Sequence, residues 1–145
     1  MLELFSLFHY LVTLKTGKQT KMKDKTILYV DDEEINLRLF KATFRRDYNI
    51  LTATSAKEGL EKLAKNTVDL VITDQRMPEV TGVEFLSKVQ AIYPHIPPGR
   101  LIISGYSDPE DIELAYKEYQ LFRFISKPWK EDELHEIILK AIGND

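Results

Sequence analysis

One short stretch, Val68–Pro78, constrains the fold of this 145-residue chain more than any other. Its first part, VDLVIT, is brief, apolar and rich in β-branched residues, which indicates a strand buried on both faces of a parallel sheet. Asp74 follows that strand directly, and a Met-Pro pair then turns the chain away. Ligands of open α/β sheets bind at the carboxyl ends of the strands, so Asp74 is predicted to lie at a functional edge.

Strand-like and helix-like segments alternate through the rest of the chain. Apolar runs predict strands at residues 26–30, 48–53, 68–73, 100–104 and 121–125, with helices after each of them. The first helix is predicted at residues 35–46, with Ile35, Leu39 and Ala42 on one apolar face. This alternation is typical of βαβ units, and it predicts an α/β fold: a doubly wound, five-stranded parallel sheet with helices on both faces.

The composition is that of a globular domain, with 43% hydrophobic and 30% charged residues. Cysteine is absent, which excludes disulfides, thiolate metal sites and cysteine nucleophiles. That absence is compatible with the reducing cytoplasm, where we expect the protein to act. The net charge of −3 argues against direct binding of nucleic acid.

The charge divides the chain into two parts. Residues 1–25 carry five lysines against two acidic residues, whereas the remaining 120 residues hold 15 basic and 21 acidic ones. We therefore expect residues 1–24 to be an apolar and basic extension, either disordered or an artefact of start-site choice, and residues 25–145 to be the folded domain. The apolar run at residues 1–14 is too short to span a bilayer, and the lysines follow it rather than precede it. A membrane is thus not an expected partner.

Polar groups end four of the five predicted strands: Asp31 and Asp32, Asp74, Ser104, and Lys127. Because parallel strands all point the same way, these groups should meet at one edge of the sheet. Three close carboxylates repel one another, and a divalent cation such as Mg²⁺ offsets that charge through oxygen ligands. A carboxylate can act as a nucleophile toward phosphorus, and a lysine can bind phosphate oxygens. Each residue alone has an ordinary structural explanation; only the combination predicts phosphoryl chemistry.

In combination these motifs resemble the receiver domain of two-component response regulators. The matching stretches are VDDEE, VITDQRMP, IISGYS and FISKPW, and the resemblance covers about residues 25–143. It implies the flavodoxin-like strand order 2-1-3-4-5, which chemotaxis regulators share. It also implies a signalling phosphoprotein rather than a turnover enzyme. Such a protein accepts a phosphoryl group from a sensor histidine kinase or a phosphotransfer protein and signals to an output protein, here unknown.

The resemblance implies a role for each residue of the acidic cluster. Asp74 would accept the phosphoryl group. Asp32 and Asp74 would ligate Mg²⁺, or Mn²⁺, directly, and Asp31 would act mainly through water. The backbone carbonyl of Arg76 would be the third protein ligand.

Further residues would bind the phosphoryl group and change conformation in response to it. Lys127 would bind it, and the Lys127–Pro128 bond would be cis. The Ser104 hydroxyl would turn toward the phosphoryl group, and Phe124 would rotate into the space that Ser104 leaves. Phosphorylation would thereby change the face formed by the fourth helix, fifth strand and fifth helix, which could also form a homodimer.

Two positions are individual to this chain. Arg76 and Tyr106 follow Asp74 and Ser104 by two residues each, so they should flank the phosphoryl site. Both side chains are large, and we expect them to shield an acyl phosphate from water.

Two alternatives stay open at the level of sequence. A pseudo-receiver would keep this fold as a protein-binding module without phosphorylation. A phosphatase of the haloacid dehalogenase type also uses an aspartate nucleophile with Mg²⁺, but it places that residue after the first strand in a D-x-D arrangement. Here the first strand is followed by adjacent aspartates, Asp31 and Asp32.

Overall fold

The computed structural model describes residues 24–106 and 108–143. Its centre is a five-stranded, all-parallel sheet with the order β2-β1-β3-β4-β5, as predicted. The strands are β1 (Thr26–Val30), β2 (Asn49–Ala53), β3 (Leu70–Thr73), β4 (Gly99–Ser104) and β5 (Arg123–Ser126). The prediction for residues 1–24 falls, apart from Asp24, outside the described residues.

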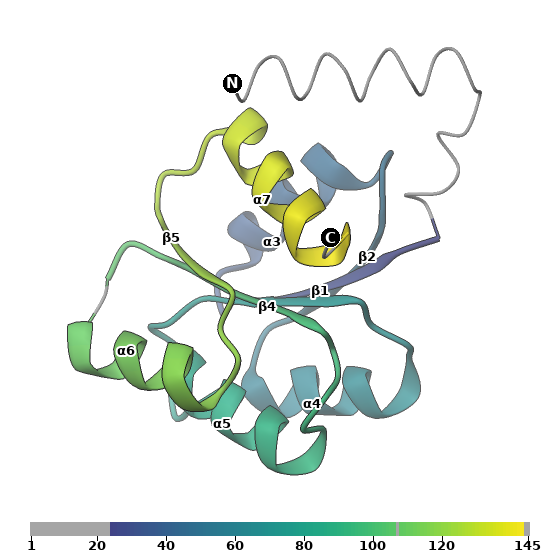
Figure 1. Cartoon of the computed structure of the whole chain (residues 1–145). Coiled ribbons are helices and arrows are strands. Elements are labelled where there is room, and N and C mark those ends of the chain that lie inside the picture. Colours follow the sequence, from purple (N-terminus) through teal and green to yellow (C-terminus); the bar gives the residue numbers. More distant parts are fainter. Residues whose placement is uncertain (1–23, 107, 144–145) are drawn as a thin grey trace.

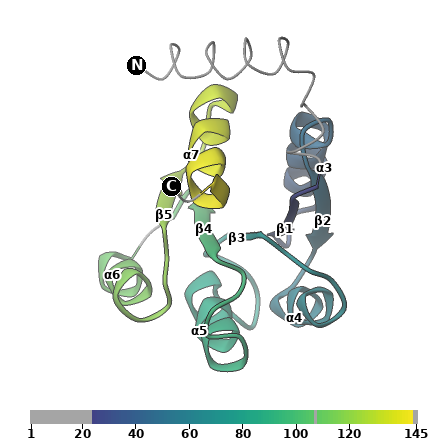
Figure 2. The ribbon, with the colours of Figure 1, turned by 45° about the vertical axis from the view of Figure 1, so that its right-hand side comes forward.

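In the part of the chain that the structure describes, five helices cover the two faces of the sheet. Helices α3 and α7 lie on one face, and α4, α5 and α6 lie on the other (Figures 1 and 2). Their bounds are α3 (Glu34–Phe44), α4 (Ala56–Lys65), α5 (Gly82–Ile92), α6 (Pro109–Glu118) and α7 (Glu131–Gly143). Within the described ranges, none of them has the length and apolar character needed to cross a membrane.

Side-chain alternation along the strands sorts the core into two halves. In β1, Leu28 and Val30 pack on the side of α4 and α5, whereas Ile27 and Tyr29 pack on the side of α3 and α7. The same period of two continues past the strand ends. It directs the side chain of Asp31, two residues after Tyr29, toward the α3–α7 side.

The apolar face picked out by the sequence pattern of the first helix is not the face that the structure buries. Ile35 and Leu39 are 73% and 57% exposed, and Ala42 is exposed as well. The buried residues of α3 are instead Leu37, Phe40 and Phe44. Both sets have helical spacing. The second set faces the core because its aromatic rings bury more area, and the ring centroid of Phe40 lies 4.7 Å from that of Tyr29.

Arg100 is fully buried in β4, although the sequence pattern assigned it to an ordinary strand. Burial lowers the pKa of its guanidinium below the ordinary value. No carboxylate is among its hydrogen-bond acceptors in the described ranges, which are the carbonyl oxygens of Tyr93, Ile96, Pro97 and Tyr119 and the side chain of Gln90. These bonds tie the ends of α5 and α6 together at the edge of the sheet opposite Asp74.

Candidate functional site

The carboxyl edge of the sheet brings together the three predicted carboxylates. One oxygen each of Asp31, Asp32 and Asp74 lies within 4.8 Å of the other two. The backbone N–H of Asp31 donates to the carbonyl of Ala53, and that of Asp74 donates to the carbonyl of Val30. The ladder of the sheet therefore continues one residue past β1 and β3, and it holds two of the carboxylates in place.

Lys127 extends into this cluster from the end of β5. Its Nζ lies 3.2 Å from Asp31 Oδ2 and 3.3 Å from Asp74 Oδ2. Burial by itself lowers the pKa of Lys127, but the charges and hydrogen bonds of Asp31 and Asp74 outweigh it and raise the pKa above its ordinary value. The amine is therefore charged at neutral pH and is shared between two carboxylates. The Lys127–Pro128 bond is cis.

Asp31 is fully buried, its Oδ1 accepts from the backbone N–H of Glu33 at 3.0 Å, and its Oδ2 has two neutral side-chain donors that the sequence reasoning missed. The Tyr29 hydroxyl donates to Asp31 Oδ2 at 2.9 Å, and Asn36 Nδ2 donates to the same oxygen at 3.2 Å. Burial, and then the charge of Asp31, raises the pKa of Tyr29, which keeps the phenol protonated. The signal that could have found Tyr29 is its spacing of two residues from Asp31 along a strand.

The carboxylate of Asp74 is fixed by its own loop. Its Oδ1 accepts a hydrogen bond from the N–H of Gln75 at 2.7 Å. The Gln75 side chain then accepts from the N–H of Val83 at 2.8 Å, in the first turn of α5. The start of α5 and the end of β3 are thus joined directly beside Asp74.

Ser104 and Phe124 lie on the opposite side of the sheet from Asp31. Ile102 is the register partner of Phe124 across β4 and β5, and Ser104 follows Ile102 by two residues, so both side chains belong to the α4–α6 side. Ser104 is buried, and its hydroxyl accepts a hydrogen bond from the N–H of Tyr106 at 3.2 Å. Phe124 is half-buried and donates its backbone N–H to the hydroxyl of Tyr116 on α6.

Arg76 and Tyr106 are in contact across the two loops that flank the site. The guanidinium carbon of Arg76 lies 4.4 Å from the ring centroid of Tyr106, which is a cation–π contact. Both side chains are exposed. The structure therefore joins the two flanking positions into one pair.

A comparison with known protein families identifies the family of the domain that carries this acidic cluster. Residues 27–139 match the model of the response regulator receiver domain. The chain belongs to this family. Among curated relatives, it is 38% identical over 120 residues to the hydrogenase transcriptional regulatory protein HoxA of Cupriavidus necator, covering 83% of this chain and 24% of that protein. The chain thus spans about a quarter of the length of the first curated relatives that it matches.

Solved receiver domains have the same fold. A response regulator receiver domain protein of Clostridium thermocellum is 34% identical with a TM-score of 0.75, covering 83% of this chain and 95% of that one. The signal receiver domain of an HD domain-containing protein of Pseudomonas fluorescens is 30% identical with a TM-score of 0.77 and the same coverage. Receiver domains are signalling modules rather than turnover enzymes, and family membership contradicts the haloacid dehalogenase alternative.

The residues of this receiver domain fit a divalent cation. Three carboxylates face one lysine in the cluster, which leaves an excess of negative charge, and every side-chain donor is a hard oxygen. Mg²⁺ prefers such ligands and retains several waters in a site with few carboxylates. Receiver domains bind Mg²⁺ at this acidic cluster, and the set present here is complete enough to do so.

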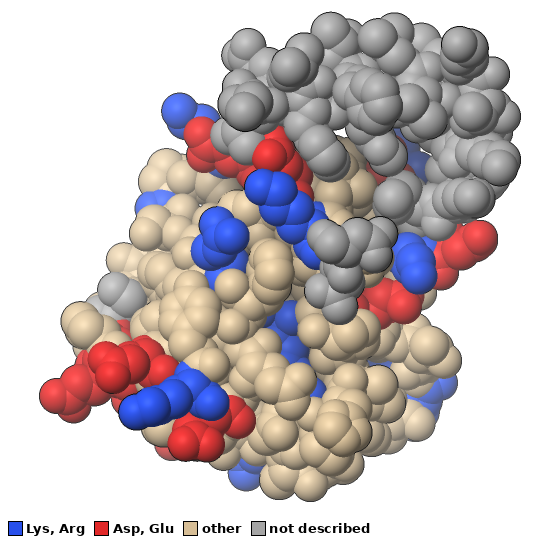
Figure 3. Space-filling view, viewed as in Figure 1, with Lys and Arg blue, Asp and Glu red and all other residues tan. Residues whose placement is uncertain are grey.

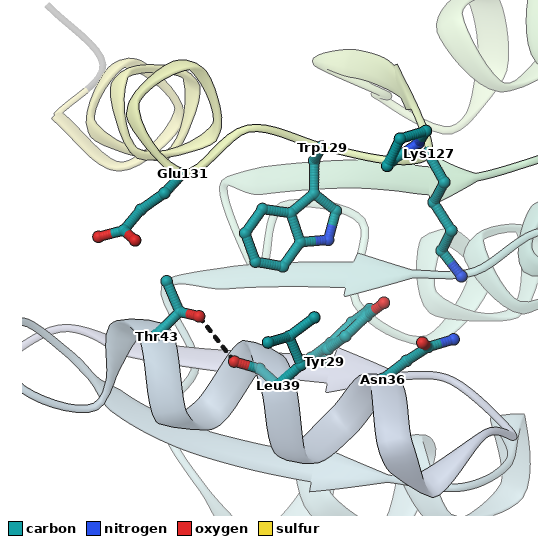
Figure 4. Close-up of a pocket in the computed structure, with 8 residues that line it drawn as sticks. Tyr29, Asn36, Leu39, Thr43, Lys127, Trp129 and Glu131 are labelled. Atoms are coloured by element: carbon teal, nitrogen blue, oxygen red, sulfur yellow. Dashed lines mark hydrogen bonds between the residues drawn. The ribbon is translucent and has the colours of Figure 1, made fainter.

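A cavity of about 480 Å³ opens beside the acidic cluster, between α3 and the segment that follows β5. Figure 4 shows the polar ends of Tyr29, Asn36 and Lys127 turned toward one another at one end of the cavity. The indole of Trp129 and the side chain of Leu39 face each other farther along it. Its lining is Tyr29, Asn36, Leu39, Thr43, Lys127, Pro128, Trp129 and Glu131.

Proposed function

We propose that this receiver domain accepts a phosphoryl group on Asp74 with Mg²⁺, from a sensor histidine kinase or a phosphotransfer protein, in the cytoplasm. One observation carries the proposal: the three clustered carboxylates have a lysine amine 3.3 Å from Asp74. That arrangement supplies a nucleophile, a cation site and a charged phosphate ligand within one edge of the sheet.

The transfer follows from these positions. An oxygen of Asp74 attacks phosphorus, the bond from phosphorus to the donor nitrogen breaks, and its electron pair remains on the donor imidazole. The amine of Lys127 turns from Asp74 to an oxygen of the incoming group. Asp32, Asp74 and the backbone carbonyl of Arg76 would hold Mg²⁺ directly, and Asp31 through water. The bound cation offsets the negative charge of the transferring group.

The signal then passes to the far side of the sheet. The Ser104 hydroxyl turns toward the phosphoryl group, and Phe124 moves into the space that it leaves. The side chain of Phe124 packs against the core cluster that contains Ala115 of α6, and its backbone N–H donates to the hydroxyl of Tyr116 on the same helix, so this movement would reach α6. The partner, an output protein or a second copy, would bind the face formed by α6, β5 and α7.

The surface of α6 favours a protein partner over nucleic acid. Acidic side chains gather over this helix (Figure 3), in the sequence PEDIELAYKE. Exposed apolar side chains lie among and beside them: Leu114, Tyr116 and Phe122 are 42%, 43% and 36% exposed. An acidic surface repels a phosphate backbone, whereas this mixture suits a protein interface.

Intact mass spectrometry tests the phosphoryl transfer. The native protein, incubated with Mg²⁺ and a small acyl-phosphate donor, is expected to gain one phosphoryl group, and Asp74→Asn is expected to gain none. The substitution keeps the size of the side chain and removes the nucleophilic oxygen. A gain in both proteins would show that a different residue is the acceptor. No gain in either, repeated with a panel of histidine kinases, would favour the pseudo-receiver.

The pair of Arg76 and Tyr106 is expected to slow the loss of the phosphoryl group by shielding it from water. The double variant Arg76→Ala, Tyr106→Ala should dephosphorylate about fivefold faster, because water would reach the phosphoryl group more easily; that factor corresponds to roughly 1 kcal/mol in the barrier to hydrolysis. The measurement is the decay of phosphorylated mass after the donor is removed.

The chain offers a matched control for this prediction. Arg123 lies 5.6 Å from the ring of Phe122, at the start of β5 and away from Asp74. The double variant Phe122→Ala, Arg123→Ala should keep the native decay rate. Equal decay of the native protein and the Arg76, Tyr106 variant would refute the shielding role.

A further inference from the structure

We propose that Tyr29 and Asn36 are positioning residues for Asp31, which hold this carboxylate in place for Mg²⁺ and keep it there when Lys127 leaves it for the phosphoryl group. The inference rests on the proposed function and adds two residues that are absent from the predicted site. Both donate to Asp31 Oδ2, the same oxygen that lies 3.2 Å from Lys127 Nζ.

The need for such residues follows from the burial of Asp31. Its exposed fraction is 0%, and a buried carboxylate is stable only when it is paired and hydrogen-bonded. The cation that the structure places beside it is Lys127, whose amine is almost equally close to Asp74. When Lys127 turns to a phosphoryl oxygen, Asp31 must keep its charge and its orientation through other donors.

Tyr29 and Asn36 meet this need because neither belongs to the segment that carries Lys127. Tyr29 lies on β1 and Asn36 on α3, whereas Lys127 follows β5, and Figure 4 shows the three side chains converging from these separate elements. Both residues are neutral donors. They therefore stabilise the carboxylate of Asp31 without placing a further positive charge next to the Mg²⁺ site.

Packing alone does not explain a tyrosine at this position. The ring of Tyr29 is 1% exposed and packs 4.7 Å from Phe40, so a phenylalanine would fill the same space. A buried hydroxyl costs free energy unless it is hydrogen-bonded, and the partner of this one among the described residues is Asp31. The hydroxyl is therefore best explained by what it does to Asp31.

The experiment is a Mg²⁺ titration of the full chain followed by the fluorescence of Trp129, the single tryptophan in the sequence, which lines the cavity beside Lys127. The test variants are Tyr29→Phe and Asn36→Leu, which remove the donors and nearly preserve shape. Each should raise the Kd for Mg²⁺ about tenfold, as the loss of a hydrogen bond to a metal-binding side chain does. Urea unfolding of each variant confirms that it is folded.

Tyr48→Phe is the matched control. It also removes a buried phenol hydroxyl from the α3–α7 half of the core, but that hydroxyl pairs with His135 rather than with Asp31. Its Kd for Mg²⁺ should stay within twofold of native. Native-like Mg²⁺ affinity in both test variants, or equal weakening in Tyr48→Phe, would overturn the inference alone. A native protein that does not bind Mg²⁺ at all would overturn the proposed function and this inference with it.

Discussion

Replacement of Lys127 by methionine is expected to slow the phosphorylation of Asp74 about 100-fold while Mg²⁺ binding is retained. Methionine preserves the apolar stem but removes the amine that lies 3.3 Å from Asp74 Oδ2. Loss of one preorganised donor to developing charge typically costs two to three orders of magnitude in rate. Mg²⁺ binding should persist, and even tighten, because the substitution removes a positive charge from the carboxylate cluster.

The two effects are separated by two measurements on one protein. Mass spectrometry over time gives the phosphorylation rate, and the fluorescence of Trp129 gives the Mg²⁺ affinity. Lys130→Met, which removes an exposed lysine three residues farther along the chain, serves as the control and should match the native protein in both. A native rate in Lys127→Met would show that this amine has no part in the transfer.

The pairing of Lys127 also sets the sign of its effect on stability with pH. Its pKa in the folded protein is raised, chiefly because Asp31 and Asp74 outweigh the opposing effect of burial. A raised pKa means that the folded state binds the proton more tightly, so the stabilisation is complete below the pKa of the unfolded chain and is lost as the pH rises through the folded pKa. The transition therefore lies above the pKa of a free lysine side chain, and Lys127 contributes no pH dependence of stability near neutral pH.

The strand ends were predictable because the information is local. A buried strand, its terminal polar residue and the direction of a parallel sheet are all readable in order along the chain, and together they place Asp31, Asp74 and Lys127 at one edge. In the structure, the amine of Lys127 lies within 3.3 Å of a carboxylate oxygen of both Asp31 and Asp74. The roles of Ser104 and Phe124 came from the resemblance, and what the structure adds is that both lie on one face of the sheet.

The features that were missed depend on contacts between distant segments. Two stripes of α3 had helical spacing, and Phe40 and Phe44 face inward, where their large rings pack against Tyr29 and Trp129 of distant segments. Arg100 appears as a polar residue in a strand until its carbonyl acceptors, up to 19 residues away in sequence, are in place. Contacts of this kind leave no periodic pattern.

Gly82→Ala is expected to destabilise the domain by about 3 kcal/mol and to slow phosphorylation about 100-fold in the fraction that remains folded. A Cβ at this first residue of α5 would overlap the carbonyl oxygen of Asp74 and lie 3.0 Å from both the carbonyl carbon of Asp74 and the Cα of Gln75. All three are backbone atoms, so no side chain can turn aside to make room. The start of α5 must therefore move away from the end of β3.

The displacement of α5 would affect both the stability of the domain and the rate of phosphoryl transfer to Asp74. It strains two hydrogen bonds that join α5 to the loop after Asp74, from Gly82 N–H to the Gln75 carbonyl at 2.9 Å and from Val83 N–H to the Gln75 side chain at 2.8 Å. Overpacking and the weakened bonds together account for the expected loss of stability, measured by urea unfolding. A displacement of Asp74 by roughly 1 Å accounts for the slower transfer.

Gly105→Ala is the control, because its Cβ would meet nothing within 4 Å although it directly follows Ser104. If Gly82→Ala matched Gly105→Ala in both measurements, the close approach of α5 would not be what holds the backbone of Asp74 in position.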